Sequence, residues 1–84
     1  MEVLSQFLSL NNRNKVGTAT KVKITSLVLA EREVKMMVYS KKEKMYIDEQ
    51  SMTIDDMINS IINNRIFINN ISLIQERMEK YLEN

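Results

Sequence analysis

The chain has 84 residues, a net charge of +1 and an ordinary composition of 44% hydrophobic and 27% charged residues. This length fits one domain spanning residues 1–84, near the lower limit for folding without disulfides or metals. The sequence has no Cys, His or Trp. Their absence excludes disulfides, a Ser-His-Asp triad and the usual zinc ligands. We therefore expect a protein that is not an enzyme and needs no metal or cofactor.

Neither a membrane span nor a secretion signal is expected from the sequence. The aliphatic run 27–30 is far shorter than the ~20 residues that a spanning helix needs. The first ten residues, MEVLSQFLSL, lack the basic start and unbroken apolar stretch of a signal peptide. We expect a cytoplasmic protein. Its many Ile, Asn, Lys and Met residues are typical of phages and low-GC bacteria.

The N-terminal segment has the apolar spacing of a short helix. Val3, Leu4, Phe7 and Leu8 fall on one helical face within residues 2–10, although a strand remains an alternative. The polar run 11–15 follows and is predicted to be a loop.

The next segment predicts a three-stranded antiparallel meander over residues 18–48. Val22 and Ile24 alternate with lysines, as in a strand with one buried face. Leu27 and Leu29 then break this alternation, so either both faces are covered there or a bulge shifts the register. Polar residues at 31–32 and 40–43 supply the two turns.

Two helices are predicted in the C-terminal half, over residues 53–63 and 70–83. Thr53 can cap the first by accepting a hydrogen bond from the amide of Asp56. Asn63 and Asn64 are suitable for its end, because Asn tolerates the left-handed conformation. The second helix has Asn69 or Asn70 as its cap. The segment 66–68 between the helices could be a short strand, a connector or part of the first helix.

The adjacent Asp55 and Asp56 invite interpretation as an acidic site. Neighbouring helical positions diverge by about 100°, so the two carboxylates do not converge on one atom. Both lie in a first turn, where negative charge favours the helix. We therefore assign them to the helix start.

Two other motifs are not supported by the sequence. Gly17 is the only glycine, and a phosphate-binding loop needs more than one. A helix-turn-helix over 54–82 is disfavoured, because its second helix is net acidic and would lie beside phosphates.

We therefore predict an α+β domain in which the two C-terminal helices cover one face of the meander. The other face would carry Leu27, Leu29, Met37 and Tyr39 beside lysines, which is too apolar to be left fully exposed. The N-terminal segment or another chain is expected to cover it.

The favoured function is that of a small, non-catalytic interaction or regulatory protein that associates with itself or with another protein. It rests on apolar positions beyond what the predicted core uses. The candidate contact residues are Leu27, Leu29, Met37, Phe67 and Leu73.

The alternative is a nucleic-acid-binding protein, and it rests on charge asymmetry. Residues 13–44 hold nine basic and three acidic side chains, a net +6, whereas residues 45–84 hold three basic and seven acidic ones, a net −4. Lysines beside a tyrosine on a sheet suit phosphates and stacked bases. The same lysines could equally be an ordinary solvated surface. The candidate contacts are Lys21, Lys23, Lys35, Lys41, Lys42 and Lys44.

Overall fold

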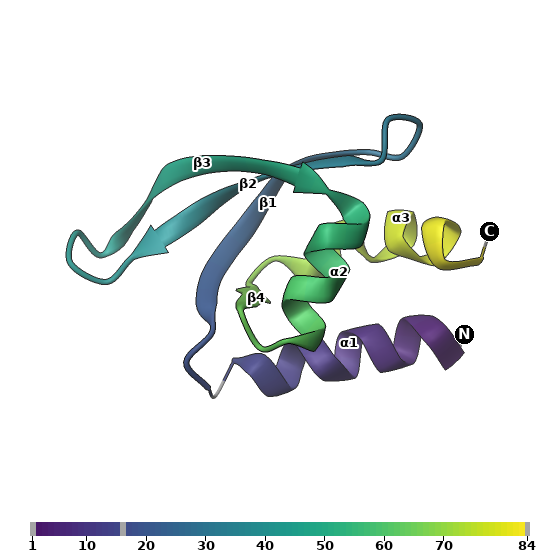
Figure 1. Cartoon of the computed structure of the whole chain (residues 1–84), viewed down its shortest axis with the longest axis horizontal. Helices are drawn as coiled ribbons and strands as arrows, with labels where there is room; N and C mark the ends of the chain where they lie inside the picture. The colour runs from purple at the N-terminus through teal and green to yellow at the C-terminus, as the bar shows by residue number, and fades with distance from the viewer. Residues whose placement is uncertain (1, 16, 84) are drawn as a thin grey trace.

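The computed structural model describes residues 2–15 and 17–83 and has an α+β fold. Its elements are α1 (Glu2–Asn14), β1 (Thr20–Val28), β2 (Glu33–Ser40), β3 (Met45–Thr53), α2 (Ile54–Ile62), β4 (Ile66–Ile68) and α3 (Ile71–Glu83). The strands form one sheet in the order β3-β2-β1-β4. The three helices lie on one side of the antiparallel strands β1–β3, and α1 packs against β4 (Figure 1).

The predicted meander is present, but the prediction of a three-stranded antiparallel sheet was wrong. The sheet is mixed, because β4 adds a fourth strand that pairs with β1 in parallel, with Lys21 opposite Phe67 and Val22 opposite Ile68. The short apolar segment 66–68 is therefore a strand. Three residues are too few to show a period of two, so β4 is defined by its partner and not by its own pattern.

A bulge in β1 resolves the broken alternation after Ile24. The register with β2 shifts between Ile24 and Ser26, and the pairing resumes with Leu27 opposite Val34. The extra residue turns Leu27 toward the helices, where only 3% of its surface is exposed. The prediction that Leu27 lies on the outer face was therefore wrong, because the bulge reverses the side to which Leu27 points.

Helix α1 continues four residues past the predicted helix 2–10, through the run that was expected to be a loop. Asn11 is fully buried, and its carboxamide both donates to the Ile68 carbonyl oxygen (3.0 Å) and accepts from the Ile68 amide (2.8 Å). Asn14, also buried, donates to the carbonyl oxygen of Ile66 at 3.1 Å and to that of Ile61. These side chains satisfy the free edge of β4, as another strand would.

The start and end of α2 agree with the sequence prediction. Thr53 precedes the helix, and its hydroxyl accepts from the Asp56 amide at 3.0 Å. After the last helical residue, Asn64 adopts a positive φ of 57°, which ends the helix. Its stripe of buried residues, Ile54, Met57 and Ile61, packs beneath the sheet.

Helix α3 follows the part of the β1 edge that β4 leaves unpaired. Asn70 was a candidate cap for this helix, but its side chain binds the strand instead. It accepts from the Ile24 amide at 2.8 Å and donates to the Ile24 carbonyl oxygen at 2.9 Å. The guanidinium of Arg77 donates to the carbonyl oxygen of Leu27. Two polar side chains thus complete an edge that would otherwise be open to water.

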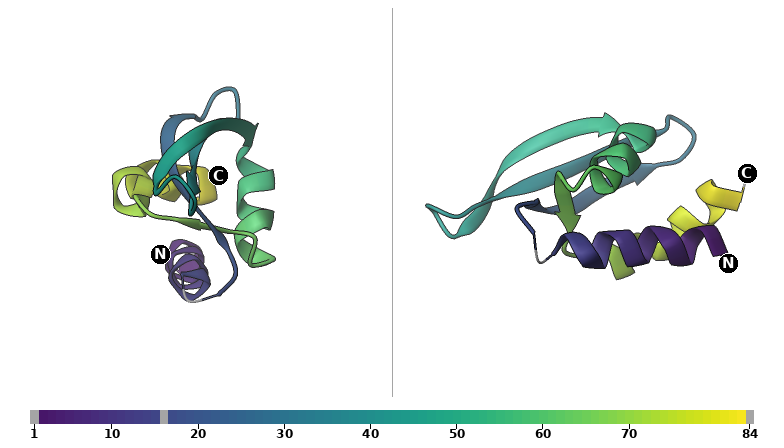
Figure 2. Two further views of the ribbon diagram at one scale, coloured as in Figure 1. Left: turned by 90° about the vertical axis from the view of Figure 1, so that its left-hand side faces the viewer. Right: turned by 60° about the horizontal axis from the view of Figure 1, so that its bottom comes forward.

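The hairpin of β2 and β3 projects beyond the helices as a curved arm (Figure 2). At its tip Lys44 has a positive φ of 59°, and its amide donates to the Ser40 carbonyl oxygen at 2.7 Å. Met45 and Ile47 on this arm are exposed. Within residues 2–15 and 17–83, no helix has the length and apolar content needed to cross a membrane.

Candidate nucleic-acid interface

The face of the sheet opposite the helices carries lysines and aromatic rings from all four strands. We call it the lysine-tyrosine face. Its lysines are exposed, and its other members are partly exposed. We define it by six residues, Lys21 and Lys23 on β1, Met37 and Tyr39 on β2, Tyr46 on β3 and Phe67 on β4; the exposed Glu49 of β3 is paired with Met37 and borders it.

Strand register brings these six side chains together. Phe67 is the partner of Lys21 across the parallel pair. Met37 is the partner of Lys23 across the antiparallel pair, and Tyr39 is the partner of Tyr46. A register shift between Val38 and Tyr39 gives this last pairing. Since paired residues point to the same side of a sheet, the register aligns the six residues across the strands.

Each lysine lies over a tyrosine ring. The Nζ atom of Lys21 is 4.3 Å from the centroid of Tyr39, and that of Lys23 is 5.2 Å from the centroid of Tyr46. The two rings meet edge to face, with centroids 5.2 Å apart and planes at 70°. Ammonium groups are attracted to the negative faces of aromatic rings, and an exposed pair contributes about 0.5–1 kcal/mol. The rings and charges therefore hold one another in place without a covering element.

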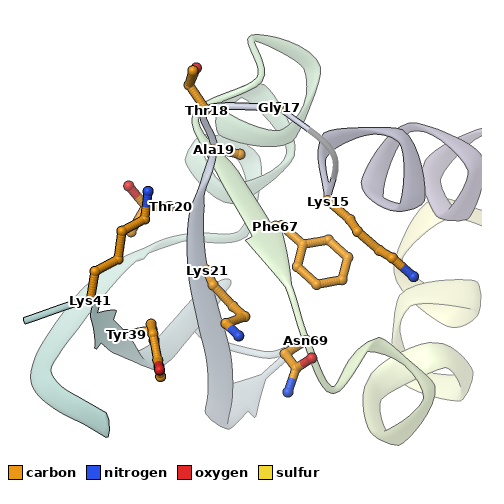
Figure 3. Close-up of a pocket in the computed structure, with 10 residues that line it drawn as sticks. All are labelled: Lys15, Gly17, Thr18, Ala19, Thr20, Lys21, Tyr39, Lys41, Phe67 and Asn69. Atoms are coloured by element: carbon orange, nitrogen blue, oxygen red, sulfur yellow. The ribbon is translucent and has the colours of Figure 1, made fainter. Parts of the chain in front are cut away.

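A hollow of about 650 Å³ opens beside this cluster (Figure 3). In the close-up Lys21 lies between Tyr39 on one side and Phe67 and Asn69 on the other. Lys15 and Lys41 supply further positive charge, and no acidic side chain is among the described residues that line the hollow. The lining residues are Lys15, Gly17, Thr18, Ala19, Thr20, Lys21, Tyr39, Lys41, Phe67 and Asn69.

The hydroxyl of Tyr46 is the one polar side-chain atom, among those of the described residues, that is buried without a hydrogen-bond partner. Loss of water around it raises the pKa of Tyr46 above its ordinary value. The Asn69 side chain is near enough to oppose this shift, and the neighbouring Tyr39 adds to it. The geometry between Tyr46 and Asn69 nevertheless falls short of a hydrogen bond, so the hydroxyl keeps its bonding capacity free.

The six predicted lysines fall in three places in the structure. Lys21 and Lys23 belong to the lysine-tyrosine face, and Lys35 is exposed further along the same side of β2. Lys41 lines the hollow, whereas Lys42 and Lys44 are exposed in the turn at the tip of the arm.

The predicted apolar contacts are scattered over the molecule. Leu27 is in the core, and Leu29 is half-buried against it. Met37 and Phe67 lie on the lysine-tyrosine face. Leu73 on α3 is 79% exposed. The outer face is therefore less apolar than the sequence suggested, since Leu27 and Leu29 are not part of it.

Three residues of the site were missed. Tyr46 was assigned to a strand, but only the register shift shows that it meets Tyr39. Lys15 and Asn69 lie in turns that the fold brings to the hollow. The sequence signalled only Lys15, as one of the basic residues of the segment 13–44, and gave no signal for Asn69 as a site residue.

The acidic side chains that the structure describes form no comparable site. In the part of the chain that the structure describes, no three carboxylates gather where they could hold a metal ion. Asp55 instead accepts a hydrogen bond from the Tyr81 hydroxyl at 2.6 Å, which ties α3 to the first turn of α2.

Comparison with protein-family models, with curated proteins and with solved structures found no match for this chain.

Proposed function

We propose that this protein is a non-catalytic binding protein that holds nucleic acid on its lysine-tyrosine face. One observation carries the proposal. The hollow beside this face combines three lysines with two aromatic rings, and no acidic side chain is among the described residues that line it. An acidic side chain in the hollow would repel phosphates. The Tyr39 and Phe67 rings distinguish the hollow from a surface whose lysines serve only to keep it solvated.

The chemistry of the site matches the two parts of a nucleotide. Lysine ammonium groups neutralise phosphates and release counterions, which supplies affinity that depends on salt. Tyrosine and phenylalanine rings offer flat apolar surfaces on which bases stack. Asn69 adds an amide that can both donate and accept hydrogen bonds at a base edge.

The proposal is tested by measuring the fluorescence anisotropy of a labelled 12-nucleotide oligomer over a range of salt concentrations. Affinity should fall steeply with salt, with a slope of about −0.7 for each phosphate that is neutralised on a single strand. The Lys21→Ala/Lys41→Ala variant should bind more weakly and reduce the slope by about 1.4. Lys80→Ala is the matched control, because Lys80 is exposed on α3 away from this face.

Two results would overturn this function. One is the absence of binding at low salt. The other is an equal loss of affinity in the Lys80→Ala control, because that would indicate a general charge effect and not a defined surface.

Self-association is a second candidate function, favoured by one observation. Leu73 is 79% exposed and borders a hollow of about 390 Å³ between α3 and β1. A second copy of the chain could bury Leu73 together with the exposed Val28. Sedimentation equilibrium at micromolar concentration should then show a dimer that Leu73→Ser converts to monomer. A monomeric wild-type protein would contradict this candidate.

A further inference from the structure

The tyrosine rings of the lysine-tyrosine face are covered in the structure. The ammonium groups of Lys21 and Lys23 lie over Tyr39 and Tyr46, at the positions that stacked bases would take. A base and a lysine cannot occupy the same ring face together. Nucleic acid can therefore reach these two ring faces only when the lysines move.

A phosphate attracts the two ammonium groups more strongly than the tyrosine rings do. Each cation–π contact at an exposed site is weak, whereas a phosphate offers an ammonium group a full opposite charge and a charge-assisted hydrogen bond. Both lysines have flexible stems and exposed positions. Rotation of these stems toward a phosphate would uncover the rings.

The arrangement in which the lysines cover the rings leaves one polar group, the Tyr46 hydroxyl, without a hydrogen bond. This hydroxyl is buried beside Asn69. A buried hydroxyl without a hydrogen bond is costly. Movement of the lysine off the ring would expose this hydroxyl and let it form a hydrogen bond to a ligand or to water. This new bond lowers the free energy needed to uncover the ring.

Resting on the proposed function, we infer that the lysine-tyrosine face is specific for single-stranded nucleic acid, and that phosphate binding by Lys21 and Lys23 uncovers Tyr39 and Tyr46 for stacking. The ligand must supply a phosphate and an unpaired base at once. Duplexes keep their bases stacked inside the helix, and simple polyanions have no bases. Both should therefore bind more weakly than a single strand.

The test compares oligomers that differ only in their bases. The dissociation constant is measured at low salt for 12-nucleotide oligothymidylate, for an abasic strand with the same number of phosphates, and for a 12-base-pair duplex. Oligothymidylate should bind about tenfold or more tightly than the abasic strand, as expected when at least one base stacks. It should also bind more tightly than the duplex.

Variants assign this preference to the two rings. Tyr39→Leu/Tyr46→Leu should reduce the preference for oligothymidylate over the abasic strand, with the Phe67 ring left in place, whereas Tyr39→Phe/Tyr46→Phe should keep the preference because it keeps all three rings. Circular dichroism verifies that each variant is folded. If the leucine variant does not fold, the single variants Tyr39→Leu and Tyr46→Leu should each reduce the ratio.

Proton NMR tests the movement itself. In the free protein the ε-methylene protons of Lys21 and Lys23 should be shifted upfield by the rings beneath them. Oligothymidylate should return them to ordinary positions. Upfield shifts that persist in the complex would overturn the uncovering step.

The outcomes separate this inference from the function on which it rests. If no oligomer binds in a salt-dependent way, both the proposed function and this inference are overturned. Equal binding of oligothymidylate and the abasic strand would leave nucleic-acid binding standing and overturn the inference. A preference for bases that is undiminished in the leucine variant would place the stacking elsewhere and would also overturn the inference.

Discussion

The covered and open faces of the sheet come from the same strands and differ in how their side chains are held. On the covered face, Val34 and Met36 are fully buried, and asparagine side chains satisfy the strand edges. On the open face, lysines lie over partly exposed tyrosines. Apolar packing fixes the first face, whereas weak and reversible contacts hold the second. The first face therefore supplies stability, and the second is free to exchange its contacts for a ligand.

Two adjacent methionines test this difference most strongly. Met36 is fully buried beneath the sheet, and Met37 is half-exposed on the lysine-tyrosine face. Met36→Ala should lower the free energy of unfolding by about 2–5 kcal/mol, because it leaves a cavity in the core. Met37→Ala should cost less than about 1 kcal/mol. Urea unfolding measures both, and equal losses would show that the two faces are packed alike.

The buried asparagine at the β4 edge should come next in size. Asn11→Ala removes both hydrogen bonds to Ile68 and leaves a buried amide and carbonyl without partners. We expect a loss of about 2–4 kcal/mol in the free energy of unfolding. Asn12→Ala is the control, because Asn12 is the exposed neighbour on the same helix. A loss below about 0.5 kcal/mol for Asn11→Ala would mean that its side chain is not needed at this edge.

Charge reversal on the open face should change binding and leave folding nearly intact. Lys21→Glu/Lys23→Glu should weaken binding of a single-stranded oligomer at least tenfold, since repulsion replaces two phosphate contacts. Its free energy of unfolding should change by no more than about 1–2 kcal/mol, because both side chains are exposed and each gives up only one weak cation–π contact. Anisotropy and urea unfolding of the same variant measure the two quantities. Unchanged affinity would contradict the assignment of this face.

The smallest predicted effect is a pH dependence at the helix contact. The hydrogen bond from Tyr81 to Asp55 raises the pKa of Tyr81, because it favours the protonated hydroxyl, and loss of water acts in the same direction. Any stability that this contact supplies is present below the ordinary pKa of tyrosine, near 10. It is lost as pH rises through the higher pKa of the folded state.

Absorbance titration at 295 nm measures this pKa, with Tyr81→Phe used to assign the signal. Asp55→Ala should move the pKa of Tyr81 down toward 10. An unchanged pKa in that variant would show that Asp55 is not the cause.

The sequence was sufficient for most of the fold because its patterns are local. The alternation around Val22 and Ile24 indicated β1, and the Thr53 cap with its acidic first turn indicated the start of α2. Errors arose where distant partners decide the structure. Asn11 and Asn14 suggest a loop in isolation, yet they remain helical because the β4 backbone bonds their side chains. The strand β4 exists only through its pairing with β1.

The candidate site was less predictable than the fold. Charge asymmetry pointed to the lysines, and alternation put Lys21 and Lys23 on one face. The bulges in β1 and β3 were not visible as definite shifts in the sequence. The first removes Leu27 from the outer face, and the second brings Tyr46 opposite Tyr39. A one-residue shift reverses the side to which a side chain points, so the composition of the face depended on both bulges.

The most direct test of the central claim is a nitrogen-15 NMR titration of the protein with 12-nucleotide oligothymidylate at low salt. Binding on the lysine-tyrosine face predicts that the amide signals of Lys21, Lys23, Tyr39, Tyr46 and Phe67 shift. The signals of exposed residues on the helical side, such as Leu73, should stay in place. Shifts confined to the helices, or no shifts at all, would contradict the account.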